Sequence, residues 1–157
     1  MKTSLQETYD GFAKSYESSR GLFDISKILD SFYSQHPIEK GELLDLGCGA
    51  GEPVARYFLD RHWLVTGVDF SERMLELAAH YAPEMKTLHA NMMDIAFNTN
   101  QFNAIIASYS LFHIPAKEHA ALFEKFHRWL KPNGKALFTY ATKEYTGSDE
   151  FDGYKKF

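Results

Sequence analysis

The stretch Asp45-Leu-Gly47-Cys-Gly49-Ala-Gly51 decides the fold, because it joins a short apolar run to a helical pattern. The run at residues 42–46 predicts a buried strand. Residues 53–59 predict a helix with a proline near its first turn, where a missing N–H costs nothing. Glycines let the backbone turn tightly and let a ligand approach with no Cβ in the way. Strand, glycine loop and helix in this order indicate a ligand-binding turn; a tight turn without a ligand is the alternative.

The segments after this loop alternate between β-type and helical patterns. We expect strands at residues 63–69, 86–89, 103–108 and 135–140. We expect helices after Ser71 and from about Lys117 to Leu130. Strands that alternate with helices predict right-handed crossovers and a doubly wound, mostly parallel α/β sheet of Rossmann-like type. Ligands on such sheets lie beyond the carboxyl ends of the strands.

Two helices are predicted before the glycine loop. One starts near Ser4, which with Glu7 has capping-box spacing, and the other follows the apolar pattern of residues 22–32. We therefore divide a single domain into three parts: a helical cover (1–36), an α/β core (41–141) and a tail (142–157).

Composition excludes some partners. The 157 residues carry a formal net charge of −4, and a nucleic-acid binder would need clustered Lys and Arg. The single cysteine, Cys48, excludes an intrachain disulfide and suits a reducing compartment. The first residues have no apolar core of a signal peptide, and no segment reads as a membrane span. We expect a cytoplasmic protein without membrane or nucleic-acid partners.

Two acids have spacing that suits a nucleoside-bearing amino-acid ligand. Asp45 stands two residues before the first glycine, where a carboxylate could hold an ammonium group but would oppose a pyrophosphate. Asp69 follows Gly51 by 18 positions at the end of the second strand, where an acid accepts hydrogen bonds from ribose hydroxyls. A helix-terminal acid is the alternative for Asp69. The G-x-G-x-G spacing argues against a nicotinamide-dependent oxidoreductase, which stays a rival.

Taken together, these motifs resemble the class I S-adenosylmethionine-dependent methyltransferases, in the small branch of ubiquinone/menaquinone-biosynthesis and tRNA-modifying-acid-synthesis enzymes. The resemblance runs from about Tyr9 to Ala141. The segments that carry it are Tyr9–Tyr16, Leu43–Gly51, Val68–Ser71, Phe102–Ser108 and Leu130–Gly134.

The resemblance implies S-adenosylmethionine as cofactor and methyl transfer to a small-molecule acceptor; a non-catalytic cofactor-binding or partner-binding domain is the alternative. It implies the following site. The methionine part would meet Gly47, Gly49 and Gly51, with Asp45 toward its ammonium and Ser108 beneath; the ribose would meet Asp69 and Phe70; the adenine would meet Asn91 and Met92; and Tyr16 would close over the cofactor.

Two features depart from the family pattern. Asn91 replaces the usual Asp, so its amide oxygen would have to accept the adenine amino group. Only 16 residues follow Ala141, and residues 147–153 read as a turn, so we expect the last two strands of the family sheet to be missing. The fifth strand would then be an apolar edge that a second copy could cover in a homodimer.

Reactive side chains are few. His113 follows the fourth strand, where a substrate would approach, and is the candidate catalytic base; a capping or packing histidine is the alternative. Cys48 reads as a small residue that fits the loop rather than as a nucleophile. The other six histidines lack metal-ligand spacing, so no metal site is expected.

Overall fold

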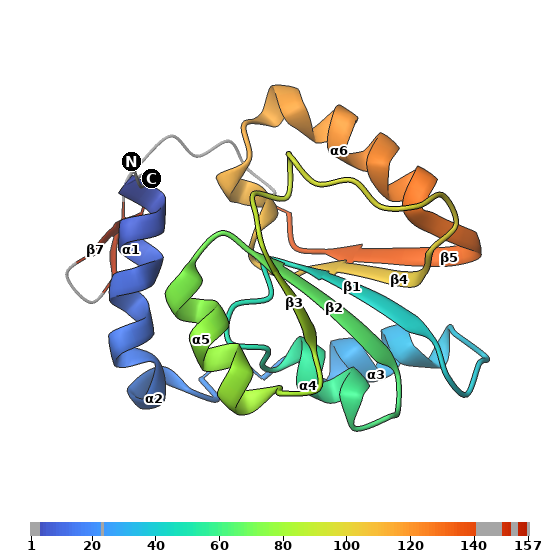
Figure 1. Ribbon diagram of the computed structural model, residues 1–157, viewed down its shortest axis with the longest axis horizontal. Helices are drawn as coiled ribbons and strands as arrows, with labels where there is room; N and C mark the ends of the chain where they lie inside the picture. The colour runs from blue at the N-terminus through green and yellow to red at the C-terminus, as the bar shows by residue number, and fades with distance from the viewer. Residues whose placement is uncertain (1–3, 23, 141–148, 152–153, 157) are drawn as a thin grey trace.

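The computed structural model describes residues 4–22, 24–140, 149–151 and 154–156. Its centre is a five-stranded sheet in the order β3-β2-β1-β4-β5, with every neighbouring pair parallel (Figure 1). The strands are β1 (Glu42–Leu46), β2 (Leu64–Asp69), β3 (Lys86–His89), β4 (Phe102–Ala107) and β5 (Leu130–Phe138). The predicted Rossmann-like α/β class is confirmed.

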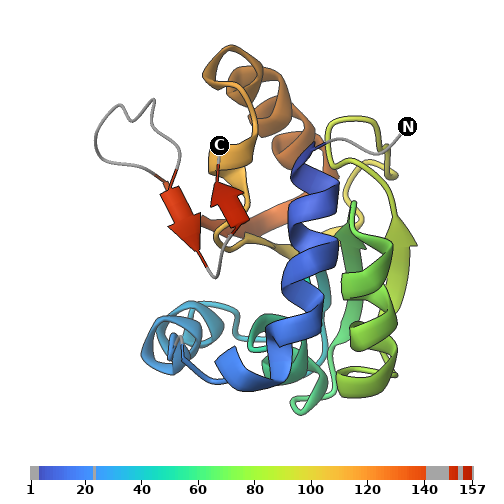
Figure 2. The same cartoon turned by 90° about the vertical axis from the view of Figure 1, so that its left-hand side faces the viewer.

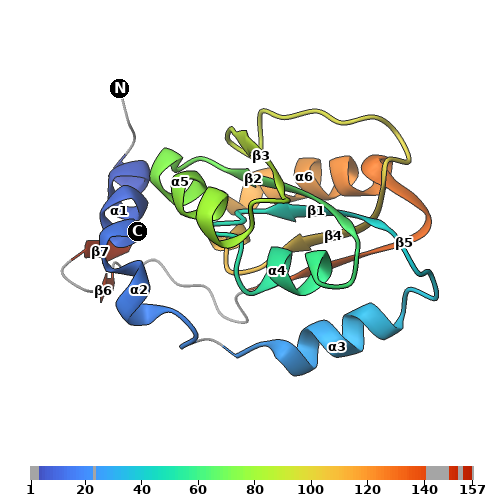
Figure 3. The same ribbon diagram turned by 60° about the horizontal axis from the view of Figure 1, so that its bottom comes forward.

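Helices cover both faces of the sheet, as Figure 3 shows. One face carries α3 (Ser26–Ser34), α4 (Val54–Leu59) and α5 (Glu72–Tyr81); the other carries α6 (Ala116–Trp129). Successive strand residues serve opposite cores, as the pleat requires: Leu43 packs with the first set of helices and Leu44 with α6. Both faces are therefore apolar, which explains the nearly continuous apolar strands.

The predicted strands lie where expected, with shifts at their ends. β3 begins and ends as predicted, while β5 begins five residues earlier, at Leu130 rather than Lys135. A register shift between Phe102 and Ala104 accommodates the extra residues opposite β4. Asn133 has a φ of +66°, so residues 131–134 bulge out of the ladder and the sequence Pro132-Asn133-Gly134 keeps its turn-like backbone within β5.

The N-terminal region divides more finely than predicted. It forms α1 (Ser4–Phe12), a 3₁₀ turn η1 (Ala13–Ser15), α2 (Tyr16–Ser19) and α3. Residues 22–25, expected in the second helix, precede it, and the Asp24 side chain accepts the Ser26 N–H where α3 begins. Helix α1 stands across the carboxyl ends of the strands, in front of the sheet in Figure 2. It therefore lies where a ligand of this sheet would bind.

The described part of the tail holds two short strands. Strands β6 (Asp149–Phe151) and β7 (Tyr154–Lys156) form a separate antiparallel pair, and β7 lies beside α1 (Figure 2). Neither short strand joins the main sheet, which has five strands within the described residues. Segments of three residues are too short to show a strand period in the sequence. The rest of the turn predicted at 147–153 lies outside the described residues.

Candidate functional site

The glycine loop leaves β1 and is held against the end of β2. The N–H groups of Gly47 and Cys48 donate to the Val68 carbonyl at 2.8 and 3.1 Å. Gly47, Gly49 and Gly51 have φ values of +75°, +52° and +84°, which L side chains rarely adopt. The loop can thus be built only with little or no side chain at these three positions.

The three glycines face different neighbours. A Cβ on Gly47 would lie 2.5 Å from the Ser110 Cβ, and one on Gly51 would lie 2.6 Å from the Ala82 Cβ. A Cβ on Gly49 would lie 3.1 Å from a Met74 methyl group. Close packing is therefore a reason for glycine both at Gly47, against Ser110, and at Gly51, against Ala82 at the end of α5.

Two buried carboxylates lie next to this loop. Asp45 is 2% exposed and Asp69 is 6% exposed, and the Oδ2 atom of Asp45 has no hydrogen-bond partner. Burial, with the negative charge of Asp69, raises the pKa of Asp45 to about 8. Burial also raises the pKa of Asp69, although backbone N–H donors oppose that shift. Because a buried carboxyl oxygen without a partner is costly, the pair fits a ligand that brings a positive charge.

Asp69 also organises the loop. Its Oδ2 accepts the Gly49 N–H at 2.8 Å, and its Oδ1 accepts the Ser71 N–H at 2.9 Å. An ionised carboxylate has about four acceptor positions, so capacity for hydroxyl donors remains. The predicted ribose role of Asp69 is therefore compatible with its backbone bonds and stays a prediction.

Helix α1 forms a wall over this end of the sheet. The hydroxyl of Tyr9 lies 2.6 Å from Nε2 of His113, and its ring contacts Phe70 edge-on with centroids 5.6 Å apart. Gln6 donates to the Phe70 carbonyl at 2.9 Å, and Ser71 donates to Asp10 at 2.6 Å. Burial and the charge of Asp69 raise the pKa of Tyr9 to about 12, so the phenol keeps its proton at neutral pH.

Tyr16 is the first residue of α2 and contacts the residue that follows the glycine loop. Its hydroxyl donates to Glu52 at 3.3 Å, and Arg20 binds both oxygens of Glu52 at 2.7 and 2.8 Å. The Arg20 guanidinium also stacks 4.4 Å from the Tyr81 ring. This network fastens the N-terminal region to the residue that follows Gly51.

The remaining predicted residues differ in placement. Met92 is buried, and its methyl group lies 3.8 Å from the Cβ position of Gly47. Asn91 is exposed, and its amide oxygen accepts the Met93 N–H at 2.9 Å. Ser108 is half-buried directly after β4. Met92 thus lies beside the glycine loop, while Asn91 lies at the surface.

Sequence reasoning missed Ser110 and Tyr9. The buried Ser110 hydroxyl donates to the Leu46 carbonyl at 2.8 Å and so joins the exits of β4 and β1. Tyr9 was part of the resemblance but received no role. Nothing in local spacing could reveal either contact, since the partners are 64 and 104 positions apart.

Cys48 is poorly suited to act as a nucleophile, because it is buried. Burial, together with the charges of Asp45 and Asp69, raises the pKa of its thiol well above the usual value. A Cβ on Gly67 would lie 2.7 Å from the sulfur, so Cys48 fills space beneath the loop.

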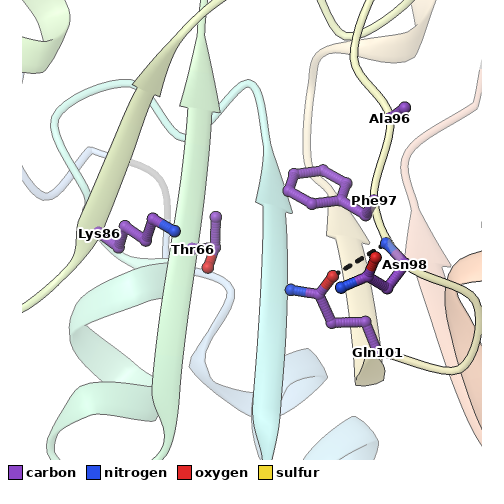
Figure 4. Close-up of a pocket in the computed structure, with 6 residues that line it drawn as sticks. All are labelled: Thr66, Lys86, Ala96, Phe97, Asn98 and Gln101. Atoms are coloured by element: carbon purple, nitrogen blue, oxygen red, sulfur yellow. Dashed lines mark hydrogen bonds between the residues drawn. The ribbon is translucent and has the colours of Figure 1, made fainter.

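Other features lie away from this end of the sheet. A hollow of about 370 Å³ lies on the α6 face of the sheet, toward the amino ends of the strands. The residues that line it are Thr66, Lys86, Ala96, Phe97, Asn98 and Gln101 (Figure 4). Within the described residues, no three His, Cys, Asp or Glu side chains gather to hold a metal ion. None of the described helices has the length and hydropathy to cross a membrane.

The parallel sheet and the glycine loop, with two buried acids beside it, are typical of nucleotide-binding α/β domains. Residues 43–134 match a family model described as methyltransferase domain, and the chain belongs to that family. The predicted resemblance to methyltransferases is thereby confirmed.

Individual relatives agree with this assignment. Phosphoethanolamine N-methyltransferase of Plasmodium falciparum is 29% identical, over 92% of this chain and 55% of that protein. A 2-phytyl-1,4-naphtoquinone methyltransferase of Nostoc is 36% identical, over 59% of this chain and 43% of that protein. An S-adenosylmethionine dependent methyltransferase structure from Mesorhizobium loti is 25% identical, with a TM-score of 0.63, over 73% of this chain and 54% of that one. The chain spans about half the length of these relatives or less.

Proposed function

We propose that this domain binds S-adenosylmethionine and transfers its methyl group to a small-molecule acceptor at the end of the sheet covered by α1. The observation that carries the proposal is the buried pair Asp45 and Asp69 beside a loop that has glycine at three of its five positions, 47–51. The cofactor would bring an ammonium and a sulfonium charge to this corner. A pyrophosphate-bearing nicotinamide cofactor would bring negative charge, which would oppose ionisation of both acids instead of stabilising it.

The residues present fit the cofactor in a definite order along the sheet. Asp45 would meet the ammonium group with its unpartnered Oδ2, and Asp69 would accept the ribose hydroxyls with its remaining lone pairs. Phe70, held by Tyr9 and Gln6, would flank the ribose. Met92 would offer an apolar contact to the adenine, with Asn91 at the exposed edge.

The side chains around His113 would serve the acceptor. When bound, the cofactor supplies a methyl group on positively charged sulfur, so the leaving group is a neutral thioether that needs no acid. Tyr9 keeps its proton and can donate it to Nε2 of His113. An acceptor that displaces the Tyr9 hydroxyl would find Nε2 ready to take the proton of its amine or hydroxyl group. Holding the reactants together lowers the barrier by roughly 7–11 kcal/mol. Base catalysis adds about 10²–10⁴-fold in rate, which corresponds to about 3–5 kcal/mol, so positioning is the larger effect.

The test has a binding arm and a turnover arm. We expect calorimetry to detect S-adenosylmethionine and its demethylated product but not the nicotinamide dinucleotides. Turnover would be followed with methyl-labelled cofactor and two acceptors suggested by the relatives, phosphoethanolamine and 2-phytyl-1,4-naphthoquinol. Binding without transfer to any acceptor would support the alternative, a non-catalytic cofactor-binding domain; absence of binding would refute both.

We also propose that the outer edge of β5 pairs with another strand. Within the described residues β5 has only β4 as a neighbour in the main sheet, and Phe138 near its end is 40% exposed. An exposed strand edge favours pairing, and a second copy related by a two-fold axis is the simplest partner.

A further inference from the structure

The segment that carries His113 is held from α6 by a second histidine. His119 is buried, and its Nε2 lies 2.8 Å from the Ile114 carbonyl oxygen and 3.2 Å from that of Leu111. Carbonyl oxygens only accept, so Nε2 carries the hydrogen. Nδ1 lies 3.2 Å from the Tyr140 hydroxyl at the end of β5, which donates to it when the ring is neutral.

The two carbonyls stand on either side of the candidate base. Leu111 and Ile114 are the residues that flank Phe112 and His113, and η2 (Leu111–His113) is a single 3₁₀ turn. A turn of this length has little intrinsic stability of its own. Its anchors are the buried Leu111 side chain and the imidazole beneath it. Helix α6, with 14 residues, is the rigid support that transmits the position of His119 to the turn.

We propose that His119 is a positioning residue that holds His113 in register with Tyr9. The inference rests on the proposed function of His113 as proton acceptor. His119 contacts the backbone of the turn and not the proposed cofactor residues. Its loss would let residues 111–114 shift, and a shift of about 1 Å can lower a reaction rate by about 10²-fold.

A purely structural role of His119 predicts a different result. His119 also packs beside Tyr140 and Phe123, with ring centroids 5.4 and 6.3 Å away, and could matter only for stability. In that case its replacement would lower the melting temperature without changing the His113 environment or the turnover of the folded protein.

Three variants separate these readings. His119→Leu removes all three hydrogen bonds of the imidazole but keeps an apolar side chain, whereas His119→Gln can still donate to the Ile114 carbonyl. His127→Leu is the matched control, because His127 is exposed on the same helix. Each variant would be examined for S-adenosylmethionine affinity, for turnover, and by ¹⁵N NMR of the His113 ring.

We expect His119→Leu to keep cofactor affinity within about twofold but to lose turnover by about tenfold or more, with a shifted His113 signal. His119→Gln should restore most of both, and His127→Leu should match the unaltered chain. An unchanged His113 signal in folded His119→Leu, or a Gln variant as impaired as the Leu variant, would overturn the proposal. If His119→Leu does not fold, His119→Gln serves as the test. A His113 signal that differs from that of the unaltered protein would then refute the positioning role of His119. If the unaltered protein transfers no methyl group, the proposed function fails, but the NMR measurement of the His113 ring still tests whether His119 positions it.

Discussion

Gly49 donates its backbone N–H to the Oδ2 atom of Asp69 at 2.8 Å, which fastens the glycine loop after β1 to the last residue of β2. The acid predicted to bind a ribose thus also shapes the loop predicted to bind the methionine part. Any change at Asp69 should therefore act on both, and its effects on binding and on folding have to be measured together.

Replacing Asp69 tests that double role. Asp69→Ala should weaken S-adenosylmethionine binding by about 1.5–3 kcal/mol, the range for hydrogen bonds to a charged group. The Gly49 N–H would also lose its acceptor, so the melting temperature should change. Asp94→Ala is the control, because Asp94 is exposed. Unchanged affinity by calorimetry in folded Asp69→Ala would contradict the assignment.

Asp45→Asn should affect binding and stability in opposite directions. The folded-state pKa of Asp45 is raised to about 8 from its usual 3.8, so the ligand-free protein keeps a proton that the unfolded chain releases. The stability contributed by this group is full below about pH 4 and is lost as pH rises toward 8, by up to roughly 1.4 kcal/mol per pH unit. The asparagine variant should lack this decline, and it should bind the cationic cofactor less tightly.

The same shift predicts proton release on binding. A cationic ligand favours the charged carboxylate, so cofactor affinity should increase with pH up to about 8 in the unaltered protein. Calorimetry in buffers of different ionisation enthalpy would measure the protons released. Equal proton counts for the unaltered protein and Asp45→Asn would show that Asp45 does not meet the ligand.

Gly47→Ala tests the steric requirement of the loop against a matched control. Gly47 and Gly21 have similar φ values, +75° and +79°, but a Cβ on Gly21 would meet nothing within 4 Å. Both alanine variants carry the cost of a positive φ, about 1–2 kcal/mol. Gly47→Ala also pushes on Ser110 and should therefore lose more stability and most cofactor binding. Equal melting temperatures in the two variants would mean that the loop adjusts freely.

Tyr9 and His113 should act as one unit. We expect His113→Ala to lower kcat by about 10²–10⁴-fold if Nε2 takes the acceptor's proton. Tyr9→Phe should reduce kcat less, and the double variant should be no worse than His113→Ala, because the pair shares one contact. Fully additive losses in single-turnover measurements would indicate separate roles.

The edge of β5 predicts a property of the protein in solution. If two copies pair there, light scattering should give twice the monomer mass. Ala136→Pro, in the middle of β5 opposite Ile105, should reduce the measured mass because proline removes a backbone N–H donor from the strand. Leu64→Lys, on β2 and 71% exposed, is the control. A monomer at all protein concentrations would exclude the homodimer.

Much of the core could be predicted from the sequence because its signals are local. Apolar runs for both-face burial, the glycines of residues 47–51 and the acids at Asp45 and Asp69 depend on neighbours within a few positions. The early start of β5 could not be predicted, since Leu130 pairs with Phe102 ahead of the bulge at residues 131–134.

Sequence alone therefore determined the class of sheet, the place of the glycine loop and the two acids beside it. Only the tertiary structure decided that Asp45 is left with an unpartnered oxygen, that Tyr9 meets His113 and that His119 supports that histidine from α6. The physical reason is the distance along the sequence over which each kind of interaction acts. Backbone periodicity and glycine conformation act between near neighbours, whereas burial, charge coupling and side-chain hydrogen bonds join residues that only the packed fold brings together.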